Sequence, residues 1–483
     1  MYLRFLIFSG LLAHSPINAK PIEPKTASLQ LRAQKLLGFC NTSDMNGLTQ
    51  TFRDQVSAKI LKDIPAEVMS DYMLRQCLDH GGFEIKNVQN TSPKSLTATL
   101  VGKKTRVELE LYLSQDSKGK LEMPSLDPMP LQGWKIPADL SDAAIIKAIQ
   151  SDVELLSDSD LFSGIVMIAR DSEVIMSEAR GYANRDRKTK ITGSTQFTLA
   201  SLSKIFTAVA AGQMVDQKKL SFDDKVSRFF PDYPNKTVRD QVTVGMLLSH
   251  SAGMGDILDK RPPAMLKDGW ARAAAFVPLT ALDELEYTPG SRQGYSNAGI
   301  ALAGAIVEKV SGIDYPPYIR KHIFEASGMI ASDPNNVPFK GPQLITPYTR
   351  RGDDNKPHQW KVATADLGSP AGGAISTADD LLKFAQSLRN GKLISKTTFD
   401  LMKKTRFGPG ISSGYGYGMS TETIYGQEWI GHNGGFDGVS TEISLMPNGP
   451  YTLVILENRD PPASEWLGTR IRTILSAKLK QGR

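Results

Sequence analysis

The chain has 483 residues, and its 57 lysines and arginines against 51 aspartates and glutamates leave a net charge of +6. With 40% apolar and 22% charged residues, the composition is that of a soluble globular protein. The length suggests about two to four domains. The basic residues form no concentrated stripe of the kind that binds nucleic acid. Two cysteines exclude a disulfide scaffold and a four-thiolate zinc site, and the six histidines form no H-E-x-x-H motif, so we expect neither a metal nor a cofactor.

The first 19 residues have the pattern of a secretory signal peptide. Arg4 precedes an apolar stretch, Phe5–Ala13, and small or polar residues follow up to Ala19. The apolar stretch is shorter than the roughly 20 residues that span a bilayer. We therefore expect a protein exported to the periplasm or secreted, without stable membrane insertion once the signal is removed. The alternative is a frayed N-terminal helix.

Residues 20–126 are predicted to form a small α+β domain. Apolar residues recur at helical spacing from Gln30 to about Leu78, and Gly81-Gly82 ends the pattern. Alternating segments then predict four strands, at Phe83–Val88, Ser95–Val101, Thr105–Leu113 and Lys120–Met123. The order resembles cone-shaped nuclear-transport-factor-like or cystatin-like domains. We find no cluster of reactive side chains here and expect a structural or recognition role of unknown kind, followed by a Pro-rich linker over residues 127–139.

Cys40 and Cys77 both fall in this first domain. In an oxidising compartment they can pair, which chain-entropy arguments value at about 3–4 kcal/mol. Two buried free thiols are the alternative, and the sequence does not decide between them.

Residues 140–483 have strands at both ends and helices between them. A helix is predicted at Ser141–Leu156, and another at Ser464–Leu479. The predicted strands are Gly164–Ala169, Val174–Gly181, Gly416–Ile424, Glu428–Gly431, Val439–Leu445 and Tyr451–Leu456. Strands from both ends can join into one antiparallel sheet flanked by helices, with the middle of the chain as an all-helical lobe. A cleft between sheet and lobe is where we expect a site.

Two serine motifs qualify as nucleophile sites. A G-x-S-x-G match at Gly410–Gly414, with Ser412 at its centre, lacks the strand-to-helix context that the motif requires, so we interpret it as a glycine-rich loop. The S-x-x-K match at Ser201 and Lys204 opens an apolar helix. Residues i and i+3 share a helix face, and an apolar setting favours the neutral, proton-accepting form of the lysine. A helix start also directs backbone N–H groups toward developing negative charge.

Two later motifs complete an ordered set. Tyr295-Ser296-Asn297 follows the Pro289-Gly290 turn, in a loop that can direct both polar side chains into a cleft. His432-Asn433-Gly434-Gly435 lies at the end of a predicted strand, where a backbone N–H can complete an oxyanion hole. Each motif is common alone, but the three in this order and context are improbable by chance.

With these motifs, residues from about Pro137 to Lys480 resemble the serine β-lactamase and penicillin-binding protein superfamily, specifically its class C-like branch. The resemblance implies that Ser201 is the acylated nucleophile, Lys204 its activating partner and Tyr295 the general base. It implies further that Asn297 binds the substrate or the lysine, that His432, Asn433 and Gly434 line the substrate site, and that the N–H groups of Ser201 and Gly435 form the oxyanion hole.

The third motif departs from class C β-lactamases, which typically have K-T-G where this chain has His432-Asn433-Gly434. H-x-G occurs in peptidase and esterase members. We therefore expect an exported serine hydrolase acting on an ester or on a D-amino-acid peptide or amide. The alternatives are a β-lactamase or D-Ala-D-Ala carboxypeptidase acting on cell-wall peptides, and a non-catalytic penicillin-binding sensor. The acyl group, the leaving group and the oligomeric state stay open.

Two further features receive an interpretation from the sequence. His250 lies in a predicted loop between helices, where we expect a structural hydrogen-bonding role rather than a catalytic base. The aromatic pair Tyr415 and Tyr417 is expected to line the cleft wall.

Overall fold

The computed structural model describes residues 24–122, 125–128, 136–257, 272–281, 284–334, 344–350, 361–362, 369–410, 413–461 and 463–481. The predicted signal peptide and most of the predicted linker lie outside these ranges. Contacts divide the chain into two compact units, one formed mainly by Phe162–Thr349 and Trp360–Arg483 and the other by Leu12–Leu161 with Arg350–Gln359. The domain boundaries expected at residues 126 and 139 stay predictions, and the contacts group the helix after the linker with the N-terminal unit.

The N-terminal unit begins with helices whose ends carry clear sequence signals. The helices are α1 (Pro24–Asn41), α2 (Met45–Gln55), α3 (Ala58–Asp63), α4 (Ala66–His80) and, after the sheet, α5 (Asp142–Asp158). Asp44 caps α2 by accepting a hydrogen bond from the Gly47 N–H, and Ser57 caps α3 in the same way. Gly81 ends α4 in the left-handed conformation, with φ of 70°.

The sheet of this unit has four antiparallel strands in chain order: β1 (Phe83–Ser92), β2 (Ser95–Gly102), β3 (Glu108–Ser114) and β4 (Ser125–Pro128). Leucines of β2 and β3 on one face are fully buried. The prediction of a strand at Lys120–Met123 is wrong. Leu121 forms only isolated bridges, to Val56 and Gln115, its N–H donates to the carbonyl of Gln55 in α2, and the fourth strand begins only at Ser125.

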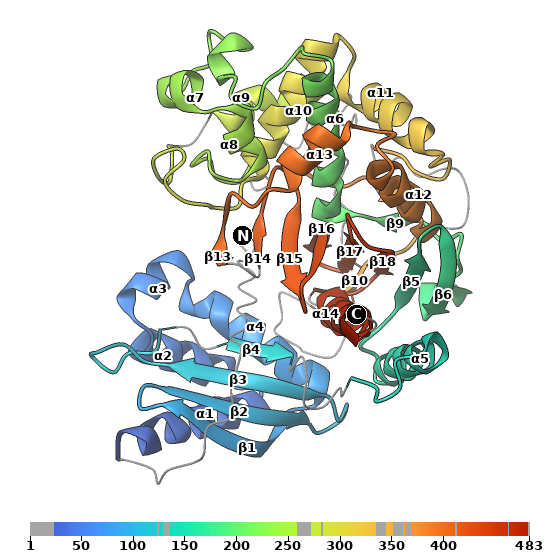
Figure 1. Cartoon of the computed structure of the whole chain (residues 1–483). Helices are drawn as coiled ribbons and strands as arrows, with labels where there is room; N and C mark the ends of the chain where they lie inside the picture. Colours follow the sequence, from blue (N-terminus) through green and yellow to red (C-terminus); the bar gives the residue numbers. More distant parts are fainter. Residues whose placement is uncertain are drawn as a thin grey trace. The chain divides into compact units, whose positions relative to one another are not determined.

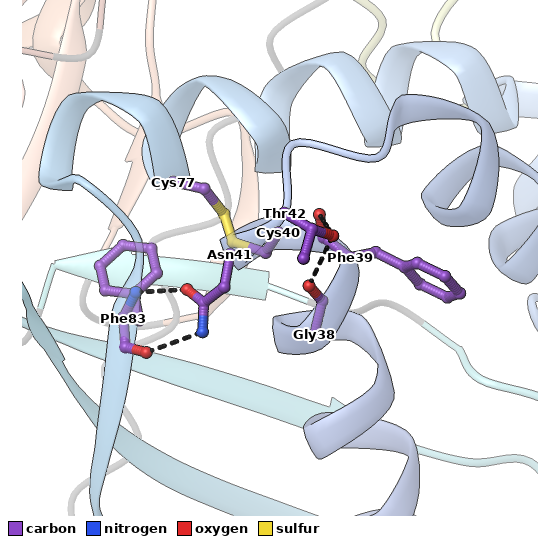
Figure 2. The surroundings of a disulfide bond; sticks show 7 residues. All are labelled: Gly38, Phe39, Cys40, Asn41, Thr42, Cys77 and Phe83. Atoms are coloured by element: carbon purple, nitrogen blue, oxygen red, sulfur yellow. Dashed lines mark hydrogen bonds between the residues drawn. A yellow bond between two sulfur atoms is a disulfide. The ribbon is translucent and has the colours of Figure 1, made fainter.

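The two cysteines form a disulfide that joins the last turn of α1 to α4 (Figure 2). The Cα atoms of Cys40 and Cys77 are 5.6 Å apart. The neighbouring Asn41 side chain accepts from the N–H of Phe83 and donates to its carbonyl, so the start of β1 is tied to the same point. The alternative of two free thiols is therefore not what the structure shows.

The second unit is built on one eight-stranded sheet in the order β13-β14-β15-β16-β17-β18-β5-β6 (Figure 1). The strands are β5 (Gly164–Arg170), β6 (Glu173–Arg180), β13 (Phe407–Gly410), β14 (Ser413–Tyr415), β15 (Ser420–Ile424), β16 (Gln427–Phe436), β17 (Val439–Leu445) and β18 (Tyr451–Glu457). Antiparallel pairing of β18 with β5 joins the two ends of the chain into one sheet. The predicted fold, an antiparallel sheet flanked by helices, is confirmed.

Helices cover both faces of this sheet. The C-terminal helix α14 (Ala463–Gln481) packs on one face, where Arg472 pairs with Glu442 of β17. On the opposite face Arg389 of α12 (Ala378–Arg389) donates to the hydroxyl of Thr452 in β18. The other helices of the unit are α6 (Lys204–Asp216), α7 (Lys236–Gln241), α8 (Val244–Leu248), α9 (Val277–Thr280), α10 (Asn297–Ser311), α11 (Tyr315–Ile319) and α13 (Lys396–Lys403).

The core of the helical lobe forms around α6 and α10, which pack against each other (Figure 1). Almost every residue of both helices is buried, including Ile205, Phe206 and Ile306. Phe206 packs edge to face on Phe324 and Phe384. The first turn of α6, from Lys204 to Thr207, is buried throughout. No helix within the described ranges is long and apolar enough to cross a membrane.

Candidate active site

Ser201 is presented by a short 3-10 turn, Ala200–Ser203, that opens α6. Ala200 has a φ of 49°, a left-handed conformation that costs a non-glycine residue of the order of 1 kcal/mol. Hydrogen bonds to a neighbouring loop hold the turn: the Leu199 N–H donates to the Ala374 carbonyl, and the Gly373 N–H donates to the Ala200 carbonyl. The surrounding structure thus stabilises a strained turn that leaves Ser201 half-buried.

The Ser201 hydroxyl contacts two groups capable of proton transfer. Lys204 Nζ donates to Ser201 Oγ at 2.9 Å, and the Tyr295 hydroxyl donates to the same oxygen at 2.6 Å. Lys204 is fully buried, and its Nζ also donates to the Ala371 carbonyl at 2.5 Å. The same nitrogen lies 4.8 Å from the centre of the Tyr295 ring. The structure therefore brings the three residues together, although Tyr295 is 94 residues away from Ser201 in sequence.

Tyr295 is held by the residue that caps α10. Ser296 accepts from the Gly299 N–H, donates through Oγ to the Gly255 carbonyl, and donates through its N–H to Nδ1 of His250. Burial raises the pKa of the Tyr295 phenol, so the phenol keeps its proton at neutral pH.

His250 supports the site from behind. Its φ is 56°, its ring centre lies 4.6 Å from that of Tyr295, and Nδ1 accepts the Ser296 N–H at 3.1 Å. Burial and the charge of Lys204 lower its pKa well below the usual value, so the ring is neutral. These contacts agree with the structural role expected from the sequence.

Asn297, the first residue of α10, is 4% exposed, and its side chain contacts the carboxylate of Asp256. Its Nδ2 donates to both carboxylate oxygens of Asp256, at 3.1 and 3.0 Å. Asp256 lies close enough to Tyr295 for its charge to contribute to the raised pKa of the phenol. A carboxylate therefore stands beside Asn297.

Strand β16 runs directly past the nucleophile turn. A Cβ added at Gly434 would lie 2.1 Å from the Leu199 carbonyl oxygen and 2.8 Å from the Leu202 nitrogen. Thr441, opposite Gly434 in β17, donates through Oγ1 to the same Leu199 oxygen at 2.9 Å. The glycine of the H-x-G motif thus permits the sheet to approach the turn, and Gly435 follows it in the strand.

His432 is buried on the site face of β16 and is engaged at both nitrogens. Nδ1 lies 2.5 Å from the Asn433 carbonyl, and Nε2 lies 2.9 Å from the Tyr415 hydroxyl of β14. Burial, together with the positive charge of Lys204, lowers the His432 pKa to about 3. The imidazole is therefore neutral.

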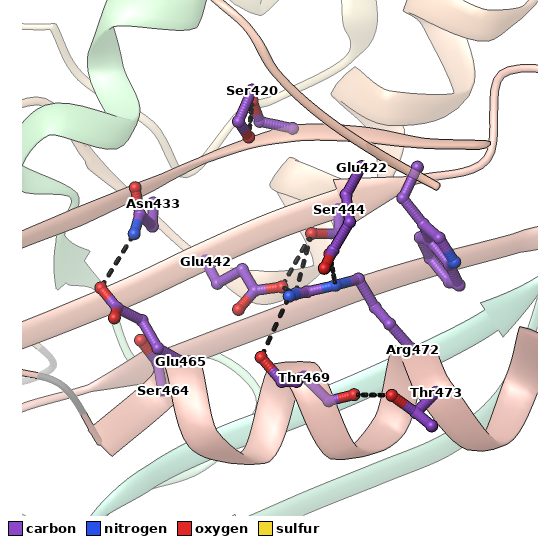
Figure 3. A network of polar contacts seen from close by, with 12 residues as sticks. Ser420, Glu422, Asn433, Glu442, Ser444, Ser464, Glu465, Thr469, Arg472 and Thr473 are labelled. Carbon is purple, nitrogen blue, oxygen red and sulfur yellow. Dashed lines mark hydrogen bonds and ion pairs between the residues drawn. The ribbon is translucent and has the colours of Figure 1, made fainter. Parts of the chain in front are cut away.

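Asn433 points to the other face of the sheet, because successive side chains of a strand alternate. Its Nδ2 donates to Glu465 of α14 at 2.9 Å (Figure 3). The structure therefore does not bring this side chain to Ser201, contrary to its expected place in the substrate site. Burial and the nearby charge of Glu442 raise the Glu465 pKa to about 7. Arg472, paired with Glu442 and Glu422, completes this polar layer behind the strand.

The alternative nucleophile, Ser412, lies outside the described residues. The flanking strands β13 and β14 pair with each other as a hairpin, so the motif does not lead into a helix. Sequence reasoning did not single out Asp256, since one acid in a glycine-containing loop carries no distinctive pattern. Among the described residues no group of His, Cys, Asp and Glu side chains is arranged to hold a metal ion.

Residues 147–478, more than half of the chain, match the family described as Beta-lactamase. The chain belongs to the beta-lactamase family. It is 27% identical over 339 residues to penicillin-binding protein 4* of Bacillus subtilis, an alignment covering 65% of this chain and 72% of that protein. The family match places this chain in the serine β-lactamase and penicillin-binding protein superfamily, which the motifs of the sequence resemble.

Solved structures share the fold. EstCE1, a hydrolase with promiscuous acyltransferase activity, is 25% identical, with a TM-score of 0.57 over 71% of this chain and 100% of its own. The D-amino acid amidase of Ochrobactrum anthropi is 22% identical, with a TM-score of 0.58 over 70% of this chain and 97% of its own, and supports the fold alone.

Proposed function

We propose that this chain is a serine hydrolase of the class C-like branch, working through an acyl-enzyme on Ser201. The observation that carries the proposal is the contact of Ser201 Oγ with both Lys204 Nζ and the Tyr295 hydroxyl, at 2.9 and 2.6 Å. A serine hydroxyl needs a neighbouring proton acceptor to become nucleophilic. A protein that binds its ligands without forming a covalent bond has no need of such an arrangement.

In acylation, the Lys204 ammonium first gives up a proton to solvent, and Ser201 Oγ then attacks the substrate carbonyl carbon while its own proton passes to the resulting amine. The raised pKa of Tyr295 makes the phenol a proton donor rather than the first base, so it protonates the leaving oxygen or nitrogen as the bond to carbon breaks. The Lys204 ammonium then returns a proton to Tyr295. Deacylation repeats these transfers with water as the nucleophile.

The negative charge that develops on the carbonyl oxygen needs two donors. We assign these to the N–H groups of Ser201, at the start of α6, and of Gly435, in the strand that Gly434 allows to approach. One donor of this kind contributes roughly 3 kcal/mol to transition-state stabilisation in other hydrolases.

The substrate that we favour is an ester or a D-amino-acid amide. Position 432 carries a neutral imidazole where β-lactamases of this branch carry a lysine, so the fixed charge that would attract the carboxylate of a β-lactam is missing from this position. EstCE1 is named as a hydrolase with acyltransferase activity, and a further protein of the same fold is a D-amino acid amidase.

Asp256 favours the amide of an amino acid within this class. Its carboxylate accepts from Asn297, and we propose that the acyl part of a substrate bound at Ser201 extends toward it. A carboxylate attracts an ammonium group and repels a carboxylate, so a free α-amino group on the acyl part fits this position.

We also propose that the protein is exported, to the periplasm or beyond the cell. The Cys40–Cys77 disulfide supports this, because disulfides persist in oxidising compartments and are rare in the cytosol.

The test compares kcat/KM for a p-nitrophenyl short-chain ester, a D-alanyl anilide and a chromogenic cephalosporin. We expect turnover of the ester and the anilide to exceed that of the cephalosporin. Fastest turnover of the cephalosporin would contradict the substrate assignment. Absence of turnover with all three, combined with stable adducts on Ser201, would favour a penicillin-binding sensor.

A further inference from the structure

Tyr415, the last residue of β14, has no role in the chemistry assigned to Ser201, Lys204 and Tyr295. Its ring centre lies 5.0 Å from that of His250, and its hydroxyl lies 2.9 Å from Nε2 of His432. Burial raises the Tyr415 pKa well above the usual value, so its hydroxyl is a proton donor throughout the neutral range.

The second contact of His432 fixes the direction of this hydrogen bond. Nδ1 faces the Asn433 carbonyl oxygen at 2.5 Å, and a carbonyl can only accept. Nδ1 must therefore carry the hydrogen. In a neutral imidazole Nε2 is then an acceptor, and the Tyr415 hydroxyl donates to it.

The groups around the ring oppose a second proton. Lys204 of α6 carries a positive charge that lowers the His432 pKa, and His250 and Tyr295, from the lobe, are buried and neutral. The Asp256 carboxylate accepts from Asn297, and its charge acts on Tyr295. A charged His432 would lose the Tyr415 donation, because both of its nitrogens would then donate.

We propose that Tyr415 is a positioning residue that holds His432 in one neutral tautomer and thereby makes this side of the site unfavourable to substrates bearing a carboxylate. With its hydrogen given to Nε2, the Tyr415 oxygen presents only lone pairs, and His432 has no N–H left for an anion. Together with Asp256 this selects neutral or amine-bearing substrates. The inference rests on the proposed hydrolase function and names its substrate class.

A matched pair of esters tests the selectivity: p-nitrophenyl butyrate and the p-nitrophenyl monoester of succinic acid, which differ by a terminal carboxylate. Tyr415→Phe removes the donor, so that Nε2 can carry the single hydrogen of the neutral ring in place of Nδ1. We expect the ratio of kcat/KM for the succinate ester to that for the butyrate ester to rise about tenfold in the variant, as for a new hydrogen bond to a charged group. The rise should be of similar size at about pH 6 and at about pH 8, because the burial and the Lys204 charge that oppose a second proton on His432 stay in place.

Tyr425→Phe is the matched control, because Tyr425 is 40% exposed at the end of β15. It should leave the ratio of the two esters unchanged. An unchanged ratio in Tyr415→Phe at both pH values would overturn the proposal. Loss of fluorophosphonate labelling of Ser201 in a folded Tyr415→Phe protein would also overturn it, by showing that Tyr415 acts on the nucleophile itself.

A spectroscopic measurement decides the tautomer without any variant of Tyr415 and without turnover. Nitrogen NMR of isotope-labelled histidine in the intact protein, with the His432 signals assigned by their loss in His432→Gln, reports which nitrogen is protonated. We expect Nδ1 protonated and Nε2 unprotonated from about pH 5 to about pH 8. Protonation of Nε2 anywhere in this range would overturn the proposal, whereas failure of Ser201 to be acylated would count against the proposed function alone.

Discussion

Gly434 lies so close to Leu199 that a Cβ at position 434 would stand 2.1 Å from the Leu199 carbonyl oxygen. The contact joins the strand of the third motif to the residue two before the nucleophile. Backbone approach of this kind requires glycine, since a real Cβ never comes so near a backbone oxygen. The pair therefore sets the distance between Ser201 and the N–H of Gly435 that we assign to the oxyanion hole.

Gly434→Ala should therefore lower kcat/KM by more than its loss of folding stability explains. The added methyl group must displace either the strand or the nucleophile turn, and overpacking of this kind costs about 1–3 kcal/mol of folding free energy. We expect kcat/KM on a p-nitrophenyl ester to fall at least about a hundredfold, as on loss of an oxyanion donor. Gly193→Ala is the control, because a Cβ there meets nothing within 4 Å. Equal activities of the two variants would refute the role of Gly434.

Asp256→Asn tests the proposed recognition of an amino group. Asn is nearly isosteric and retains an oxygen for Asn297 Nδ2, but it loses the negative charge. We expect kcat/KM for a D-alanyl anilide to fall about tenfold more than kcat/KM for a p-nitrophenyl acyl ester without an amino group. Parallel loss on both substrates would show that Asp256 serves the site through Asn297 rather than by attracting an ammonium group.

The disulfide gives a prediction about the N-terminal unit. Replacing both Cys40 and Cys77 by Ser should lower the stability of that unit by about 3–4 kcal/mol, since the bond closes a loop of 37 residues. Because the residues around Ser201 belong to the other unit, the rate of fluorophosphonate labelling should stay within about twofold below the unfolding transition. Slowed labelling of the folded variant would mean that the N-terminal unit contributes to the site.

Glu465 predicts a pH dependence of stability. Its folded-state pKa of about 7 is raised above the usual value of 4.5, so the folded state binds a proton that the unfolded state has lost. The carboxyl therefore lowers stability progressively as the pH rises from about 4.5 to about 7. Glu465→Gln, which keeps an acceptor for Asn433, should be more stable than the original protein at about pH 8, by at most about 3 kcal/mol, and nearly equal to it at about pH 4. Thermal unfolding at both pH values checks this, with the exposed Glu173→Gln as control. A gain of equal size at both pH values would contradict it.

Much of this architecture follows from local sequence. The strand Val439–Leu445 is predicted with the bounds that the structure has, because polar residues alternate with Val439, Thr441, Ile443 and Leu445 and a clear turn follows at Asn448-Gly449. The fourth strand of the N-terminal sheet is misplaced, since the bond of Leu121 to Gln55 is a tertiary contact that alternation does not report. The S-x-x-K spacing likewise places Lys204 beside Ser201, because i and i+3 share a helix face.

Other parts of the site depend on which strand faces which loop. The orientation of Asn433 toward Glu465 follows from the pleat of β16, whose phase the motif alone does not give. The pairing of Tyr415 with His432 depends on β14 and β16 lying on either side of β15. The sequence predicted Tyr415 as a residue of the cleft wall and His432 as a site residue, but not the hydrogen bond between these two; Tyr417, the other residue predicted for the cleft wall, belongs to the hydrophobic core.

Intact-mass detection of Ser201 acylation tests the central claim most directly. The full chain and its Ser201→Ala variant are incubated with a fluorophosphonate, and each adduct is located by peptide mapping. We predict one adduct on the original protein, on the peptide containing Ser201, and none on a folded Ser201→Ala variant. Undiminished labelling of that variant, with the adduct at Ser412 or elsewhere, would contradict the account.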